Sequence, residues 1–130
     1  MEFERDQYGQ ISYDPGLGVL ELEWFETSEG MTDEDFKSAL ERLAAHAEER
    51  GASNIAIDVT SFRHRPASAV GAWRDANIIP RYNSAGVERF AFLVPPGAAS
   101  SEPSPEPPGT FPTGYFESRA AIADWFEAAR

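Results

Sequence analysis

The chain contains no cysteine, only two histidines and a single lysine among its 130 residues. Without cysteine, disulfides, thiolate zinc sites and cysteine nucleophiles are excluded. The two imidazoles, His46 and His64, are too few for a histidine-rich metal cluster, so a metal site would need carboxylates to complete it. We therefore expect no metal and no cofactor.

Long apolar runs are missing as well. No stretch approaches the roughly 18 residues that cross a bilayer. The acidic first ten residues lack the basic and apolar parts of a signal peptide, so we expect a cytoplasmic protein without a transmembrane segment. The net charge of -11 opposes attraction to nucleic acid, and no nucleic-acid partner is expected.

Short apolar strands and amphipathic helices alternate along the chain. Residues 10–13 and 19–24 read as an antiparallel hairpin around a Pro-Gly turn, with an acidic solvent face made by Glu21 and Glu23. A helix then begins at the N-cap Thr32 and ends at Gly51. Its inner stripe is predicted to contain Phe36, Leu40, Leu43 and Ala47, with His46 in solvent near the end.

Residues 54–59 form an apolar run broken only by Asp58, which is typical of a central strand covered on both faces. A helix over residues 68–79 should follow and end at Pro80, with Val70, Trp73 and either Ala76 or Asn77 facing inward. Residues 87–94 are predicted to form the next strand.

Residues 95–114 are rich in proline, serine and glycine, which predicts a mobile surface loop within the domain. A species-specific insertion explains this composition better than a motif for a polyproline-binding partner. Residues 111–116 can add a short strand before Ser118 caps a final helix with an inward stripe of Ile122, Trp125, Phe126 and Ala129. The order β-β-α-β-α-β-(β)-α predicts a single α/β domain over residues 1–130, with a mixed, mostly parallel sheet and an N-terminal antiparallel hairpin.

Three patches resemble the STAS domain superfamily, and in particular its SpoIIAA-like (STAS/Sec14-like) branch. They are IAIDVTSF at 55–62, VERFAFLV at 87–94 and FESRAAIADWF at 116–126. In signalling STAS domains an Asp-Ser pair opens the second helix, and a partner kinase phosphorylates the serine. Here Pro66-Ala67 stand at that place, so the resemblance leaves Ser68, with Thr60 as a second candidate, as the phospho-acceptor.

The densest basic patch is Arg63-His64-Arg65. If Ser68 starts the following helix, the free amides and positive dipole end point toward these side chains and form an anion site, which Arg74 would extend. The alternative is a solvated loop whose arginines pair with surface carboxylates. Asp58 is expected to organise the turn by accepting loop amides, although a buried base with a raised pKa is the other interpretation.

These features favour a non-enzymatic regulatory or binding module that recognises a partner protein or a small anionic ligand at the loop after the central strand. The SpoIIAA-like resemblance points the same way, because that branch generally lacks a defined reaction. The alternative is a carrier of an apolar or lipid-like molecule, in a pocket lined by Trp73, Phe62, Tyr82 and Phe90, unless these aromatics are plain core. Neither Ser61 nor Ser68 lies in a nucleophile elbow, which disfavours a hydrolase. An exposed edge in the hairpin or in 87–94 would allow a homodimer.

Overall fold

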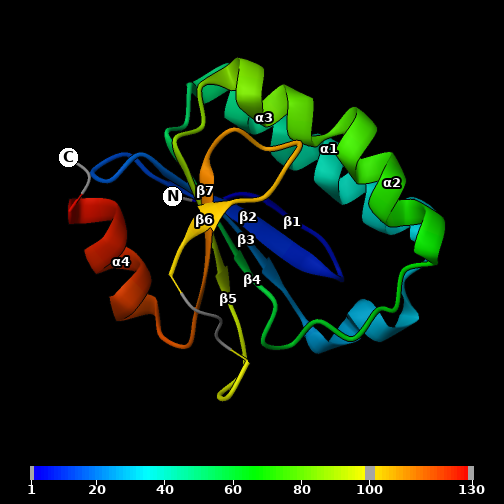
Figure 1. The fold of residues 1–130 in the computed structure, drawn as a ribbon. Helices are drawn as coiled ribbons and strands as arrows, with labels where there is room; N and C mark the ends of the chain where they lie inside the picture. Colours follow the sequence, from blue (N-terminus) through cyan, green and yellow to red (C-terminus); the bar gives the residue numbers. More distant parts are fainter. Residues whose placement is uncertain (1, 99–101, 129–130) are drawn as a thin grey trace.

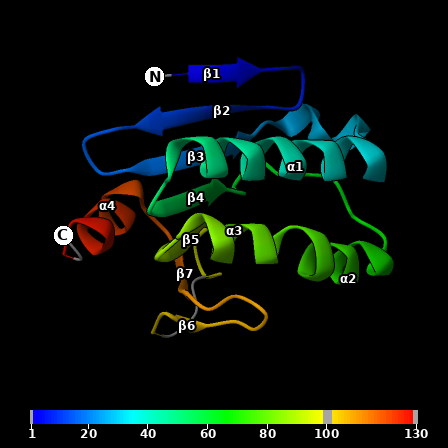
Figure 2. The ribbon, with the colours of Figure 1, turned by 90° about the horizontal axis from the view of Figure 1, so that it is seen from above.

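The computed structural model describes residues 2–98 and 102–128. Its seven-stranded sheet has helices on both faces (Figure 1). The strands lie in the order β1-β2-β3-β4-β5-β7-β6, with β1 and β6 at the two edges (Figure 2). Their bounds are β1 Glu2–Arg5, β2 Gly9–Asp14, β3 Val19–Trp24, β4 Asn54–Asp58, β5 Arg89–Leu93, β6 Ser104–Pro105 and β7 Pro112–Phe116. The predicted α/β fold class is confirmed.

The sheet is parallel at its centre and antiparallel at its edges. Strands β3, β4, β5 and β7 are parallel neighbours. The predicted antiparallel hairpin is formed by β2 and β3. Strand β1, which was not predicted, pairs antiparallel with β2 at one edge, and β6 pairs antiparallel with β7 at the other. The strand predicted at 87–94 is β5 and lies inside the sheet, so the idea that it offers an edge for a second copy was wrong.

Helices α1 (Asp33–Arg50), α2 (Ser68–Asn77) and α3 (Ile79–Ala85) cover one face, and α4 (Arg119–Ala128) covers part of the other (Figure 1). The bounds of α1 follow from local chemistry. Thr32 and Asp35 form a reciprocal capping box, and Gly51 ends the helix in the left-handed region at φ 61°. A short 3₁₀ helix, η1 (Glu26–Gly30), leads from β3 into this cap.

Strand β4 divides the core in two, because all five of its residues are buried. Ile55 and Ile57 belong to the larger cluster under α1, α2 and α3. Ala56 belongs to the smaller cluster under α4, together with Ile122 and Phe126. Alternation along one strand thus supplies both layers of the core.

Pro80 does not end the helix that precedes it, as the sequence had suggested. It stands in the first turn of α3, where the missing amide of proline costs no hydrogen bond. Ile78 joins α2 to α3 and is buried, whereas Ala76 and Asn77 are exposed. The buried residues of this region are therefore Val70, Ile78 and Tyr82, and Trp73 packs partly buried against the same core, as predicted.

His46 is not a solvated residue at a helix end, contrary to expectation. Its side chain is 17% exposed, and its Nε2 lies 2.8 Å from Oε1 of Glu4 in β1. The partner lies 42 positions earlier in the chain, so no local pattern could reveal it.

The prediction of a surface loop over residues 95–114 was wrong for its second half. Figure 1 shows the segment between β6 and β7 lying beside α3. The Asn83 side chain of α3 holds this segment: it accepts from the Thr110 amide at 3.0 Å and donates to the Pro108 carbonyl at 3.1 Å. Phe111 is buried and stacks on Phe90 with ring centroids 5.8 Å apart. Residues 99–101 and Ala129, which the same predictions included, lie outside the described residues.

None of the helices in the described ranges combines the length and the apolar character that crossing a membrane requires.

The anchoring of the proline-rich segment predicts a measurable stability contribution. Phe111→Ala should lower the free energy of unfolding in urea by about 3–5 kcal/mol, because a buried phenylalanine side chain is removed. Glu102→Ala, at an exposed position of the same segment, is the control and should change it by less than about 0.5 kcal/mol. Equal, small effects of both variants would contradict the packing of Phe111 in the core.

Candidate functional site

Asp58 lies at the end of β4, where the predicted functional loop begins. Its Oδ1 accepts hydrogen bonds from the Thr60 amide at 3.0 Å and from the Thr60 hydroxyl at 2.6 Å. Its Oδ2 accepts from Nη2 of Arg119 at 2.8 Å. The buried carboxylate is thus fully engaged in shaping the turn, and the Thr60 hydroxyl is occupied as its donor.

Arg119, which sequence reasoning missed, joins two acids on the α4 side of the sheet. Its Nη1 donates to Oε1 of Glu21 at 2.6 Å, while Nη2 reaches Asp58. The hydrogen bond to Glu21, together with the nearby carboxylates, raises the pKa of Arg119. Glu21 is therefore partnered rather than simply solvated.

The start of α2 already holds a carboxylate of the protein itself. Both Oδ atoms of Asp33, the first residue of α1, lie 3.4 Å from the Ala67 amide nitrogen at the N-cap of α2. The same carboxylate lies 2.8 Å from Nε2 of His64. Asp33 thus occupies the place in which the sequence predicted an external anion, beside the positive end of the helix dipole.

The structure divides the predicted basic patch. His64 is only 9% exposed and packs against Phe36 and Phe62. The Arg63 amide donates to Oγ of Ser28 at 2.8 Å, and its exposed guanidinium lies 3.8 Å from Glu26. Arg65 and Ser68 are exposed on the outside of the loop.

Arg74 lines a cavity bounded by the sheet, the helices α1, α2 and α3, the loop after β4 and the proline-rich segment. This helix-side cavity has a volume of about 240 Å³. Three of the four aromatics predicted for an apolar pocket line it: Phe62, Tyr82 and Phe90. Trp73 does not line it and instead packs beneath the ammonium of Lys37, 5.3 Å from its ring centroid.

Aromatic rings form much of the wall of the helix-side cavity. Toward the start of α1, Trp24 contacts both Phe36 and Phe62, with centroids 5.7 and 5.1 Å apart. Toward α3, Phe90 contacts Tyr82 at 5.5 Å and stacks on Phe111. Because each ring is held by another, the wall is shaped before any ligand enters. The remaining apolar lining comes from Leu40, Ile57, Val59, Ile79 and Phe92.

The rim of the cavity is polar and reaches solvent. The Arg74 guanidinium lies 3.5 Å from the Asp75 carboxylate, and these side chains are 44% and 47% exposed. Glu106, which also lines the cavity, accepts the hydrogen bond of the Tyr115 hydroxyl, whose oxygen lies 2.9 and 2.8 Å from the two carboxylate oxygens. Partial burial, and then this hydrogen bond, raise the pKa of Tyr115 to about 12. The phenol therefore stays protonated as a donor at neutral pH.

Tyr82 is the polar group of the inner wall. Burial raises the pKa of its hydroxyl, with Arg74 and Arg81 acting in the opposite direction. The hydroxyl therefore stays protonated at neutral pH and can donate a hydrogen bond to a bound molecule.

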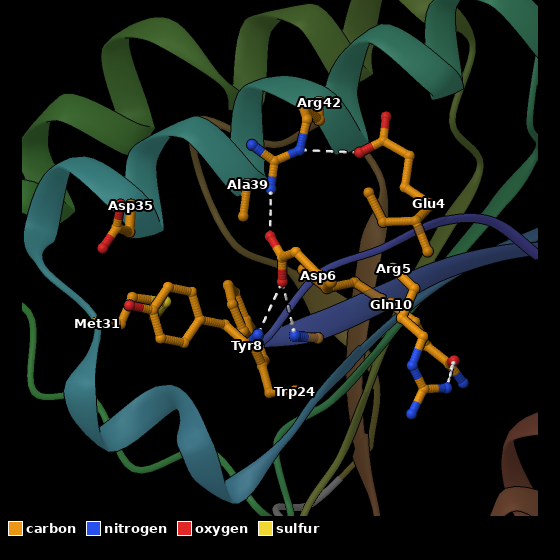
Figure 3. A pocket seen from close by; sticks show the side chains of 13 residues that line it. Glu4, Arg5, Asp6, Tyr8, Gln10, Trp24, Met31, Asp35, Ala39 and Arg42 are labelled. Atoms are coloured by element: carbon orange, nitrogen blue, oxygen red, sulfur yellow. Dashed lines mark hydrogen bonds and ion pairs between the residues drawn. The ribbon is translucent and has the colours of Figure 1, made fainter.

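Two further cavities have their polar groups paired internally. In the one between β1, β2 and α1, of about 260 Å³, Arg42 contacts Glu4 at 2.9 Å and Asp6 at 3.2 Å, and Asp6 accepts from the Tyr8 amide (Figure 3). The other, of about 390 Å³ beside α4, contains the Arg119 ion pairs. Within residues 2–98 and 102–128, no group of three or more histidine and acidic residues is placed to hold a metal ion.

Comparison with protein-family models, with curated proteins and with solved structures finds no match to this chain. The resemblance to STAS domains therefore stays a prediction that rests on the three sequence patches. The site has to be interpreted from its own geometry.

The contacts of Asp33 predict that its replacement destabilises the protein more than replacement of the neighbouring Glu34. Asp33→Ala should lower the free energy of unfolding by about 1–2 kcal/mol, because the Ala67 amide and His64 lose their acceptor. Glu34→Ala is the matched control: it is also in the first turn of α1, but its side chain is 85% exposed. Equal effects in urea denaturation would show that Asp33 acts only through the dipole of α1.

Proposed function

We propose that the protein is a non-enzymatic binding module that takes a small, mostly apolar molecule into the helix-side cavity. The observation that carries the proposal is the cavity itself, an aromatic-lined space with an opening at Arg74, Asp75 and Glu106. Close-packed interiors normally leave few voids larger than a water molecule, since atoms lining a void lose dispersion contacts. A bound apolar molecule would restore those contacts.

The volume limits the size of the ligand. An apolar cavity of about 150 Å³ holds benzene, whereas sites for drug-sized molecules begin near roughly 300 Å³. The helix-side cavity, at about 240 Å³, lies between these values. One aromatic ring with a short side chain, or two fused rings, is therefore the expected size.

A second candidate function concerns the outside of the loop. Arg65 is exposed just before α2, and Ser68 is exposed as its first residue. This arrangement supports a regulatory surface of the SpoIIAA-like type, for a partner protein or a small anion, with Ser68 as a phospho-acceptor. A cytoplasmic location belongs to the same proposal, as does a homodimer formed through the β1 edge.

Filling the cavity should abolish binding of a neutral probe. Val59 lines the helix-side cavity, so Val59→Phe should weaken binding of naphthalene, followed by ligand-observed NMR, by at least about tenfold. Val19→Phe makes the same change in the cavity beside α4 and should leave naphthalene binding unchanged. Loss in both variants, or in neither, contradicts the proposed site.

The loop surface has its own test. If Arg63 and Arg65 form an anion site, inorganic phosphate should shift the amide resonances of residues 63–68, and the double variant Arg63→Ala, Arg65→Ala should remove these shifts. Shifts that persist in the double variant would show that the phosphate binds elsewhere. The double variant should bind naphthalene as tightly as the unmodified protein, and this result would confirm that the variant is folded.

A further inference from the structure

The charged residues of the rim indicate which kind of apolar molecule the helix-side cavity prefers. The charged side chains lining it are Arg74, Asp75 and Glu106. Two carboxylates against one guanidinium leave one net negative charge at the opening. Arg74 is already within 3.5 Å of Asp75, so the carboxylate without a cationic partner in the lining is Glu106.

The Tyr115 hydroxyl does not neutralise Glu106. A phenol donates a hydrogen bond to the carboxylate but carries no positive charge. The bond fixes the position of the Glu106 carboxylate and leaves lone pairs on its oxygens for a further donor. Glu106 is exposed on the segment that Asn83 anchors to α3, so it is held at the edge of the opening.

The aromatic wall of the cavity favours a cation, as the charged rim does. Faces of Trp, Tyr and Phe rings carry the negative part of the ring quadrupole and attract cations placed over them. Seven of the lining residues are aromatic: Trp24, Phe36, Phe62, Tyr82, Phe90, Phe92 and Phe111. The net charge of the whole chain, -11, adds attraction for cations at long range.

We infer that the helix-side cavity selects an aromatic or alicyclic amine, with the ring among the buried aromatics and the ammonium group at Glu106. This inference rests on the proposed function and adds the ligand class. It also assigns Glu106 as the specificity-determining residue. An apolar carboxylate of the same size is disfavoured, because its charge meets Glu106 and Asp75 while Arg74 is engaged by Asp75.

Three probes of similar size but different charge test the preference for an amine separately from binding in the cavity. They are 2-phenylethylamine, which is an ammonium ion at neutral pH, 2-phenylethanol, which is neutral, and 3-phenylpropionate, which is an anion. Measured by ligand-observed NMR at low salt, the amine should bind at least about tenfold more tightly than the carboxylate, with the alcohol between them.

Glu106→Gln should reduce the preference for the amine over the carboxylate by at least about threefold, because it removes the charge but keeps an acceptor for Tyr115. Glu102→Gln is the matched control: it makes the same change at an exposed position of the same segment, outside the lining, and should leave the preference unchanged. Arg74→Gln should increase the preference. Unchanged affinity for 2-phenylethanol in each variant shows that the cavity is intact.

Carboxylate binding that equals or exceeds amine binding would overturn the inference, and so would a preference that Glu106→Gln leaves unchanged. In either case, 2-phenylethanol binding that Val59→Phe abolishes would still support the cavity as a binding site. If none of the three probes binds, the proposed function fails together with the inference.

Discussion

The two-sided burial of β4 is the constraint on which the rest of the structure depends. A strand with every residue buried needs helices on both faces of its sheet, and these are α1, α2 and α3 on one side and α4 on the other. The same burial places the carboxyl group of Asp58 where little water reaches it. Donors from Thr60 and Arg119 compensate for that loss, and in doing so they fix the turn that leads to α2.

The two faces of the sheet are filled differently. The α4 side is packed by Ala56, Ala91 and Ile122 near the sheet, and by Phe126 with the partly buried Phe116 and Trp125. On the helix side, aromatic rings contact one another in offset and tilted pairs around the helix-side cavity and leave it unfilled. Asp33 meanwhile supplies the anion at the start of α2 from within the chain. For these reasons the interior beside the loop is a stronger candidate for binding than its basic exterior.

Local signals in the sequence predicted the elements well. Thr32 and Gly51 mark the bounds of α1 because caps depend on neighbouring residues, and the run around Ile55 and Ile57 marks β4 because only a buried strand is so apolar. The predictions failed where a residue's environment depends on a partner far away in the sequence. His46 meets Glu4, His64 meets Asp33, and Phe111 is drawn from a proline-rich segment into the core by Phe90 and Asn83. Glu106 lies in that same segment, whose composition gives no sign of a cavity rim.

The central claim is that a small apolar molecule binds on the helix side of the sheet. Intermolecular NOEs to bound naphthalene test it most directly, because they report which ring protons the ligand touches. The account predicts NOEs to Phe90 and Phe111, which line the helix-side cavity, and none to Phe116 and Trp125, which pack together on the α4 side. NOEs to the second pair, or no NOE to either, would contradict it.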